Sequence, residues 1–220
     1  MRNVDFYFDY LSPFAYLASL QIADVCREAN TELTFRPVLF PALLQHWGQR
    51  GPAEIAPKSV HTFKECLRYA RTRGIPLRAP KLHPFNPLLA LRATWAADSN
   101  DERRRIMHAL YTLGWAQGGD LSSETEIVAA LSAANLNAAI LIERAQSPEI
   151  KQRLRTETEA AIARGVFGVP TMIVDDELFW GVSQLEYLAL YLTDRDPLAG
   201  LDWTQLIPSG KGAWRRGVSE

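Results

Sequence analysis

"FYFDYLSPFAYLA", residues 6–18, joins an apolar, aromatic segment to the start of a helix. Residues 4–9, "VDFYFD", favour a strand because aromatic and β-branched side chains suit a pleated surface. Ser12 is a good N-cap, and Pro13 is tolerated in the first turn of a helix. The stretch therefore predicts a strand that leads directly into a helix, with a hydroxyl at the join. Local sequence leaves open whether Ser12 is only a cap or also a reactive group.

The residues that follow extend this pattern to a second strand. Apolar side chains recur at helical spacing from Tyr16 to Cys26, which predicts one helix after Pro13. Residues 33–40, "LTFRPVLF", then favour a strand, in which Pro37 indicates an edge position or an early end. A strand, a helix and a strand in this order predict a parallel pair joined by a right-handed crossover.

Strand signals return near the end of the chain. Residues 170–180, "PTMIVDDELFW", predict a β-hairpin with an Asp-Asp turn, and residues 183–194 predict a closing helix. Between the two strand regions, residues 43–56 form a loop rich in Gly and Pro, and we find no strand signal from about residue 58 to 165. Helical segments are predicted there at residues 59–74, 86–98, 101–118, 123–134 and 147–165.

The order of elements predicts an α/β protein with a thioredoxin-like fold, βαβ plus ββα, interrupted by a large all-helical insertion. The thioredoxin-like domain would comprise residues 1–42 and 166–197, and the loop and helical insertion residues 43–165. Residues 198–220 form a tail to which the sequence assigns no structure.

Composition excludes several functional classes. The 220 residues are 47% hydrophobic and 22% charged with a net charge of -1, so nothing indicates binding to nucleic acid or to a membrane. The first ten residues lack the apolar core of a signal peptide, which predicts a cytoplasmic protein. Cys26 and Cys66 form no CxxC pair and have no metal-ligand spacing with the four histidines. We therefore expect two buried, inert thiols and no metal site.

In a thioredoxin-like fold, the join between the first strand and the first helix carries the reactive group. Redox members place C-x-x-C there, whereas this chain has Ser12-Pro13-Phe14-Ala15, which excludes dithiol chemistry at this position. Val169-Pro170 precedes the first strand of the hairpin, where such proteins place a cis-proline. The residue before that proline offers its backbone N–H and C=O to an extended peptide. The alternative is an ordinary turn proline.

These motifs together resemble a known family. "FYFDYLSPFAYLA", "GPAEIAPK", "HPFNPLLALR" and "GVFGVPTMIVDDELFWG" are similar to the 2-hydroxychromene-2-carboxylate isomerases, which are relatives of kappa-class glutathione transferases and DsbA-like proteins. The resemblance covers roughly residues 4–193. It implies that glutathione is the cofactor, that Ser12 donates a hydrogen bond to its sulfur and favours the thiolate, and that the protein is a homodimer.

The resemblance also implies roles for other residues. It places the glutathione backbone at Val169 and Pro170, with further cofactor contacts at Gln49, Trp180 and Ser183. It places the substrate near Lys58, Asn86 and Phe14. Lys58 is equally well explained as a solvated surface lysine, and Asn86 as a helix cap before Pro87. Several aromatic side chains are candidates either for an apolar substrate pocket or for the core, namely Phe14, Tyr16, Phe40, Trp47 and Phe85.

One position departs from the family pattern. Family members commonly have "FWG-x-D-R-L" after the hairpin, with an acidic residue near the γ-glutamyl end of glutathione. This chain has Ser183 in place of the Asp and Gln184 in place of the Arg. Ser183 starts the last predicted helix, whose N–H groups favour a carboxylate, but the acid expected opposite the γ-glutamyl ammonium is missing.

The sequence therefore predicts a glutathione-dependent isomerase. Its partners would be glutathione and a small aromatic 2-oxo acid, and it would interconvert 2-hydroxychromene-2-carboxylate and trans-o-hydroxybenzylidenepyruvate by reversible thiolate addition. Two alternatives stay open. One is a kappa-like glutathione transferase or peroxidase that acts on other electrophiles, and the other is a non-catalytic thioredoxin-like binding module.

Overall fold

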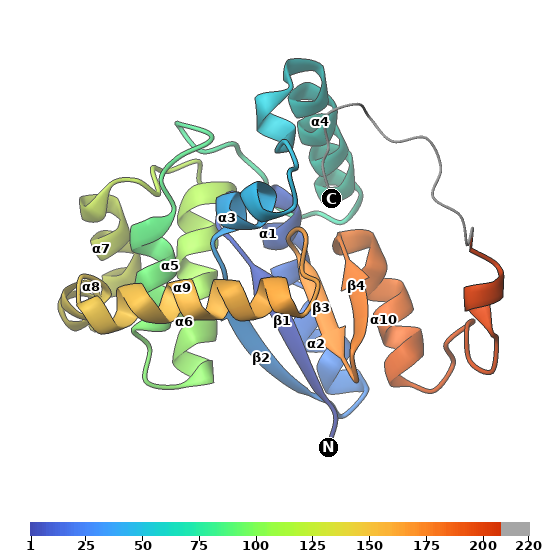
Figure 1. The fold of residues 1–220 in the computed structure, drawn as a ribbon. Helices are drawn as coiled ribbons and strands as arrows, with labels where there is room; N and C mark the ends of the chain where they lie inside the picture. The colour runs from blue at the N-terminus through green and yellow to red at the C-terminus, as the bar shows by residue number, and fades with distance from the viewer. Residues whose placement is uncertain (208–220) are drawn as a thin grey trace.

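A computed structural model describes residues 1–207 of the chain and contains one four-stranded mixed sheet. The strands are β1 (Asn3–Phe8), β2 (Glu32–Pro37), β3 (Thr171–Val174) and β4 (Glu177–Trp180), and their order in the sheet is β2-β1-β3-β4. The predicted thioredoxin-like fold is confirmed. In Figure 1, helices α5 to α8 gather beyond one side of the sheet, α9 lies across its front, and α4 stands above the end of β1.

The first half contains the predicted parallel pair, since Asn3 to Phe8 of β1 face Glu32 to Pro37 of β2. Strand β2 is at the edge and ends at Pro37, as the sequence predicts. The prediction of one continuous helix is wrong. The chain forms α1 (Pro13–Ser19) and α2 (Ile22–Glu28), because Gln21 leaves the helical conformation with φ -123°.

The segment after β2 also differs from the sequence prediction. Helix α3 (Phe40–His46) occupies the beginning of the expected loop. Helix α3 begins at Phe40 because its N–H donates to the Asp9 Oδ2 at 2.8 Å, and Pro41 then fits in its first turn. The rest of the loop contains a single 3-10 turn, η1 (Pro52–Glu54).

The second half is the predicted hairpin followed by a helix. Strands β3 and β4 are antiparallel, with Thr171 opposite Trp180 and Val174 opposite Glu177. The turn residues Asp175 and Asp176 have φ 50° and 66°, the left-handed pair that a two-residue hairpin turn requires. A 3-10 turn, η3 (Val182–Gln184), then leads into α10 (Leu185–Leu192).

The insertion is helical, as predicted. Its elements are α4 (Ala56–Thr72), α5 (Leu88–Trp95), α6 (Asn100–Tyr111), the π-helical turn η2 (Thr112–Ala116), α7 (Glu124–Ala133), α8 (Ala138–Ala145) and α9 (Pro148–Ala163). Helix α8 is missing from the sequence prediction. It is capped by Asn137, whose side chain accepts from the Ile140 N–H at 3.3 Å. Of the tail, residues 198–207 contain the 3-10 turn η4 (Trp203–Gln205), and residues 208–220 lie outside the described part.

Alternation along β1 divides its side chains between two cores. Val4, Phe6 and Phe8 belong to the larger core, which continues without interruption into α5, α6 and α7. Tyr7 belongs to a smaller core on the opposite face, together with residues of α9 such as Ala161. The insertion therefore shares a core with the strand that precedes Ser12.

The outer edge of β2 is covered by side chains of α6. The Asn100 amide donates to the Leu33 carbonyl at 2.6 Å and accepts from the Phe35 N–H at 3.0 Å, as a neighbouring strand would. Arg103 donates to the Phe35 carbonyl at 3.1 Å. These bonds satisfy the edge and block further strand pairing there. Within residues 1–207, none of the helices combines the length and the apolar character that crossing a bilayer requires.

Candidate functional site

Ser12 begins α1 at the end of the loop that follows β1. Its backbone is extended, and its Oγ accepts from the Ala15 N–H at 3.2 Å, so Ser12 is the N-cap that the sequence predicts. The same Oγ donates to the Val169 carbonyl oxygen at 3.2 Å. Pro13 has no N–H, which leaves the Phe14 N–H as a donor without a partner among residues 1–207. The hydroxyl therefore joins a local cap to a segment 157 residues away.

Val169 and Pro170 lie opposite Ser12 and are joined by a cis peptide bond. Val169 is buried, and its backbone N–H has no hydrogen-bond partner within the described residues. The Pro170 carbonyl accepts from the Gly181 N–H at 2.9 Å, which fixes this segment against the end of β4. Val169 therefore presents an N–H without a partner in residues 1–207 and a carbonyl that accepts only from the Ser12 hydroxyl there. An extended peptide can pair with such a residue as a neighbouring strand would.

The loop between β1 and Ser12 is held by the insertion through its backbone. Each carbonyl of residues 9, 10 and 11 accepts a hydrogen bond from a different side chain of the inserted helices and loops. The donors are the Tyr111 hydroxyl to Asp9 (3.0 Å), the Trp115 indole to Tyr10 (2.8 Å) and the His83 Nε2 to Leu11 (2.9 Å). Because Tyr111 ends α6 and Trp115 lies in the π-helical turn η2, the insertion sets the direction from which the chain reaches Ser12.

Asp9 is a fully buried carboxyl three residues before Ser12. Its Oδ1 accepts from the Leu11 N–H and its Oδ2 from the Phe40 N–H, each at 2.8 Å. Burial raises the pKa of Asp9 to about 7, because removal from water disfavours the charged form by more than the two N–H bonds favour it. This side chain joins the Ser12 loop to the first residue of α3.

The other side of Ser12 is more open. Trp180 is 52% exposed, and its indole lies against Phe167 with ring centroids 5.0 Å apart. A Cβ added to Gly168 would be 2.6 Å from the Trp180 Nε1, so a glycine is needed for this close approach. Ser183 is exposed in η3, which packs against α1.

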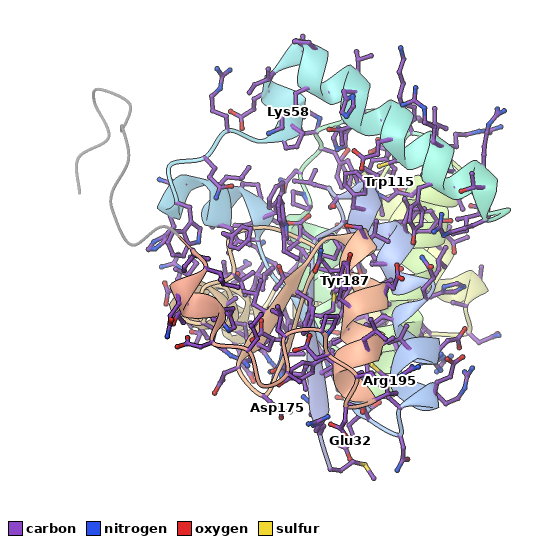
Figure 2. All side chains as sticks on the ribbon, turned by 90° about the vertical axis from the view of Figure 1, so that its right-hand side faces the viewer. Glu32, Lys58, Trp115, Asp175, Tyr187 and Arg195 are labelled. Atoms are coloured by element: carbon purple, nitrogen blue, oxygen red, sulfur yellow. The ribbon has the colours of Figure 1, made fainter. Side chains whose placement is uncertain are left out.

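Gln49 and Lys58 lie on either side of the 3-10 turn η1. The Trp47 indole donates to the Val166 carbonyl at 3.0 Å, which ties the end of α3 to the segment before Val169. Gln49 follows in an exposed loop, and Lys58 is exposed in the first turn of α4, as Figure 2 shows from the side. No hydrogen bond or ion pair within residues 1–207 joins either side chain to Ser12.

Asn86 has the capping geometry that was one of its two interpretations. Its Oδ1 accepts from the Leu88 N–H at 3.0 Å, at the beginning of α5. Its predicted contact with the substrate stays a prediction. Among the aromatic candidates, Tyr16 and Phe85 are buried in the core, Phe14 and Phe40 are half-buried against it, and Trp47 is exposed.

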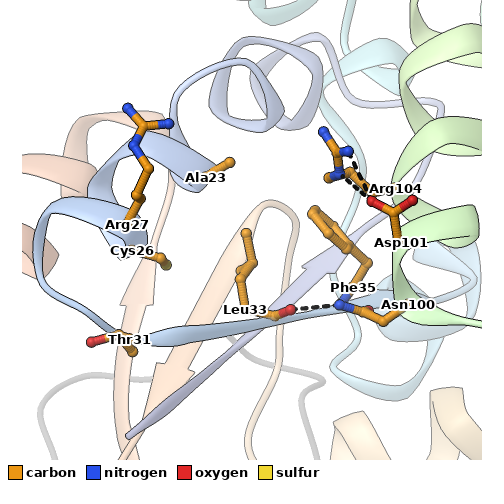
Figure 3. Close-up of a pocket in the computed structure, with 9 residues that line it drawn as sticks. All are labelled: Ala23, Cys26, Arg27, Thr31, Leu33, Phe35, Asn100, Asp101 and Arg104. Atoms are coloured by element: carbon orange, nitrogen blue, oxygen red, sulfur yellow. Dashed lines mark hydrogen bonds and ion pairs between the residues drawn. The ribbon is translucent and has the colours of Figure 1, made fainter.

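The two cysteines are buried and unpaired, and burial raises the pKa of each thiol to about 12. Cys26 contributes to a cleft of about 380 Å³, shown in Figure 3. This cleft lies beside the first half of β2, whereas Ser12 follows the last residue of β1, so it is separate from Ser12. Its lining residues are Ala23, Cys26, Arg27, Thr31, Leu33, Phe35, Asn100, Asp101 and Arg104. No group of His, Cys, Asp and Glu among the described residues could hold a metal ion.

Sequence reasoning missed four residues that build this site: Asp9, His83, Tyr111 and Trp115. An acid within the aromatic run "FYFDY" is a signal for Asp9, because a carboxylate is costly among buried rings. No local signal identifies Tyr111 or Trp115, because their spacing from Ser12 along the chain carries no information on contact.

Comparisons with known proteins place the chain in a family. Residues 3–193 match the family model of the DSBA-like thioredoxin domain. A 2-hydroxychromene-2-carboxylate isomerase of Sphingobium xenophagum is 32% identical over 195 residues, which cover 88% of this chain and 99% of that protein. Human glutathione S-transferase kappa 1 is 25% identical, and the alignment covers 96% of this chain and 97% of that protein.

A similar structure has also been solved. A structure of 2-hydroxychromene-2-carboxylate isomerase superposes with a TM-score of 0.81 at 24% sequence identity, and the match covers 87% of this chain and 95% of that one. At this identity the superposition establishes the fold alone.

Proposed function

Because this chain belongs to the DSBA-like thioredoxin-domain family, and within it to the family of 2-hydroxychromene-2-carboxylate isomerases, we propose that it is a glutathione-dependent isomerase. Its substrates would be 2-hydroxychromene-2-carboxylate and trans-o-hydroxybenzylidenepyruvate. The observation that carries this proposal is the position of the Ser12 hydroxyl, between the first turn of α1, where the Phe14 N–H has no partner among residues 1–207, and the backbone of Val169.

The residues on both sides of Ser12 fit the backbone and the sulfur of glutathione. The Val169 N–H, which has no partner within residues 1–207, and the Val169 carbonyl are suited to the cysteinyl part of an extended tripeptide. Pro170, Trp180, Ser183 and Gln49 would complete the cofactor site. When bound, glutathione supplies a thiolate that adds reversibly to the conjugated side chain of the substrate and allows rotation about its double bond.

Ser12 would favour the charged form of that sulfur. Its hydroxyl has one proton to donate, and in this structure it donates it to the Val169 carbonyl. Turning that proton to a sulfur would stabilise the thiolate and free the carbonyl to accept an N–H from the tripeptide. The Phe14 N–H and the positive end of α1 act in the same direction.

Lys58, Asn86 and Phe14 are the proposed substrate contacts. Lys58 carries a positive charge suited to a carboxylate and has no ion pair within residues 1–207, and Phe14 is half-buried directly after Pro13. The protein is proposed to act as a cytoplasmic homodimer, by analogy with its family. A second candidate function is a glutathione transferase that acts on other electrophiles, which the similarity to the human kappa-class enzyme supports.

The test is an assay of chromene isomerisation by the purified full-length protein, with and without glutathione. We expect glutathione to stimulate turnover and Ser12→Ala to lower it by about 10²-fold, the effect of removing one donor aimed at developing charge. Ser147→Ala is the matched control, because Ser147 caps α9 before Pro148 with the same 3.2 Å bond. It should lose a similar helix cap and keep its activity.

Three outcomes separate the alternatives. Absence of glutathione binding by calorimetry would overturn both glutathione-dependent functions and leave a binding module. Binding with turnover of general electrophiles, such as 1-chloro-2,4-dinitrobenzene, but not of the chromene would favour the transferase. Equal losses in Ser12→Ala and Ser147→Ala would show that Ser12 acts as a cap alone.

A further inference from the structure

His83 is the histidine that contacts the loop before Ser12. The other three lie on outer helices and have different neighbours: His46 at the end of α3 beside Trp47, His61 on α4 beside Glu65, and His108 exposed on α6. His83 lies in the segment between α4 and α5, and its ring is exposed. An ionisable group is thus held against the residue next to Ser12 and stays open to solvent.

The hydrogen bond of His83 determines which of its nitrogens is available. Its Nε2 is 2.9 Å from the Leu11 carbonyl oxygen, and a carbonyl can only accept, so Nε2 carries a proton. The Nδ1 has no hydrogen-bond partner within residues 1–207 and can take up and release a proton while the Nε2 bond is kept. The rings of Trp115 and Phe85 lie 5.4 Å and 6.3 Å from the imidazole, centroid to centroid, and fix its orientation.

The reaction of the proposed function needs a group of this kind. Opening of the chromene ring removes a proton from the hydroxyl at carbon 2 and delivers a proton to the ring oxygen, which becomes the phenol. Neither oxygen can exchange the proton with Asp9, because that carboxyl is fully buried and both of its oxygens are occupied by N–H groups. The single proton of the Ser12 hydroxyl is assigned to the glutathione sulfur in the proposed function, and its oxygen accepts from the Ala15 N–H of the α1 cap.

We propose that His83 is a catalytic residue that carries this proton between the two substrate oxygens, a role that rests on the proposed function. In the opening direction, Nδ1 takes the proton of the hydroxyl at carbon 2. The bond from carbon 2 to the ring oxygen breaks with its electron pair on that oxygen, and the carbonyl forms. The phenolate then takes the proton back from Nδ1–H. Closing is the reverse, and the proton count is unchanged.

Several titratable groups belong to the elements packed around His83. The packed elements bring three titratable groups: Asp9 and Tyr10 from the loop and Tyr111 from α6. Burial raises the pKa of both phenols, so they stay neutral. Asp9 titrates in the same range as a histidine, since its pKa is about 7. Lys81, which lies in the same segment as His83, forms an ion pair with Glu126 at 2.8 Å.

The test compares His83→Gln and His83→Ala with the wild type. Glutamine can still donate to the Leu11 carbonyl but cannot carry a proton, so we expect kcat to fall by about 10²-fold, within the range for loss of a general acid–base. Glutathione affinity by calorimetry should stay within twofold. One inflection of the pH–rate profile should disappear, while any inflection from Asp9 remains. Added imidazole should partly restore His83→Ala, and His108→Gln should behave like the wild type.

A readout besides turnover is the NMR titration of the His83 ring with chromone-2-carboxylate, an unreactive analogue of the substrate. We expect its ring signals and apparent pKa to shift on binding, and those of His108 to stay unchanged. An unchanged kcat and pH profile in His83→Gln would overturn the role of His83 while the proposed function stands. The role of His83 would also be overturned if the His83 variants lost glutathione affinity in parallel with kcat and imidazole did not restore activity. That result would indicate a structural role. A wild-type protein without isomerase activity would overturn both.

Discussion

Two helices of this protein begin with the same motif, Ser12-Pro13 at α1 and Ser147-Pro148 at α9. Each serine has an extended backbone and accepts from the N–H three residues later at 3.2 Å. In each case the serine carbonyl also accepts from the N–H of the residue four positions later, at 3.2 Å. By local sequence and local geometry, the two are the same cap.

Their surroundings differ. The Ser12 hydroxyl also donates to the Val169 carbonyl, and the three carbonyls before it are held by Tyr111, Trp115 and His83. No side chain among residues 1–207 donates to the three carbonyls before Ser147. Tertiary structure, rather than the Ser-Pro pair, therefore distinguishes a candidate site from a cap, and each prediction below removes one part of that difference.

The largest effect is expected from Asp9→Asn. A buried acid lies three residues before Ser12, whereas Arg144 occupies the same position before Ser147, so this substitution removes one difference between the two caps. The pKa of Asp9 is raised to about 7 in the folded state from an ordinary value of 3.8. The folded state then keeps its proton longer than the unfolded one, so the free energy of unfolding falls as pH rises from about 4 to about 7. With ~1.4 kcal/mol for each pKa unit, Asp9 contributes a fall of roughly 4 kcal/mol, which Asp9→Asn would lack.

Urea titrations of both proteins at several pH values between 4 and 8 measure this difference. The wild-type and Asp9→Asn stabilities should converge or cross as pH rises, and Asp24→Asn, in an exposed position of α2, should run parallel to the wild type. Parallel curves for the wild type and Asp9→Asn would contradict the raised pKa.

A smaller effect is expected from Tyr111→Phe, which removes one of the three bonds to the Ser12 loop. Tyr10→Phe is its control: both phenols are fully buried, but the Tyr10 hydroxyl pairs with Thr94 at 2.6 Å instead of a loop carbonyl. The Asp9 carbonyl keeps its 3.4 Å bond from the Ser12 N–H, and Thr94 keeps its 2.8 Å bond to the Ala90 carbonyl. Each variant therefore loses one buried hydrogen bond and should lose about 0.5–1.5 kcal/mol of stability. Glutathione affinity, by calorimetry, should weaken in Tyr111→Phe alone. Equal weakening in both would mean that the bond to Asp9 does not position Ser12.

These contrasts also explain how far the sequence predicts the molecule. The strands and the hairpin follow from alternation and turn residues that are local, and the Asp175-Asp176 turn is an example. The helix break at Gln21 and the start of α3 at Phe40 depend on contacts with distant residues, such as the bond from the Phe40 N–H to Asp9. Periodicity cannot reveal such contacts.

The candidate site divides in the same way. The position of Ser12 in the chain and its role as a cap follow from residues 6–18, and the resemblance to a family supplies Val169 as its opposite wall. The hydrogen bonds that hold the carbonyls of residues 9–11 come from residues 83, 111 and 115, which lie on separate elements. Because their pairing is decided by how α6 and η2 pack on the sheet, a single sequence contains no signal for it.

The smallest effect is expected from Ser183→Asp, which tests the open side of Ser12. Ser183 is the second residue of the 3-10 turn η3, which packs against α1, but its side chain is exposed and has no hydrogen-bond partner among the described residues. If the γ-glutamyl ammonium of glutathione lies there, a carboxylate would add an exposed ion pair worth about 0.2–1 kcal/mol, or roughly a 1.4- to 5-fold gain in affinity.

Calorimetry at low and high salt separates charge from shape, because screening should abolish the gain at 1 M salt. Ser183→Asn has nearly the same shape without the charge and should bind like the wild type. A gain in Ser183→Asn equal to that in Ser183→Asp would place the ammonium elsewhere and leave the serine as a neutral part of the wall.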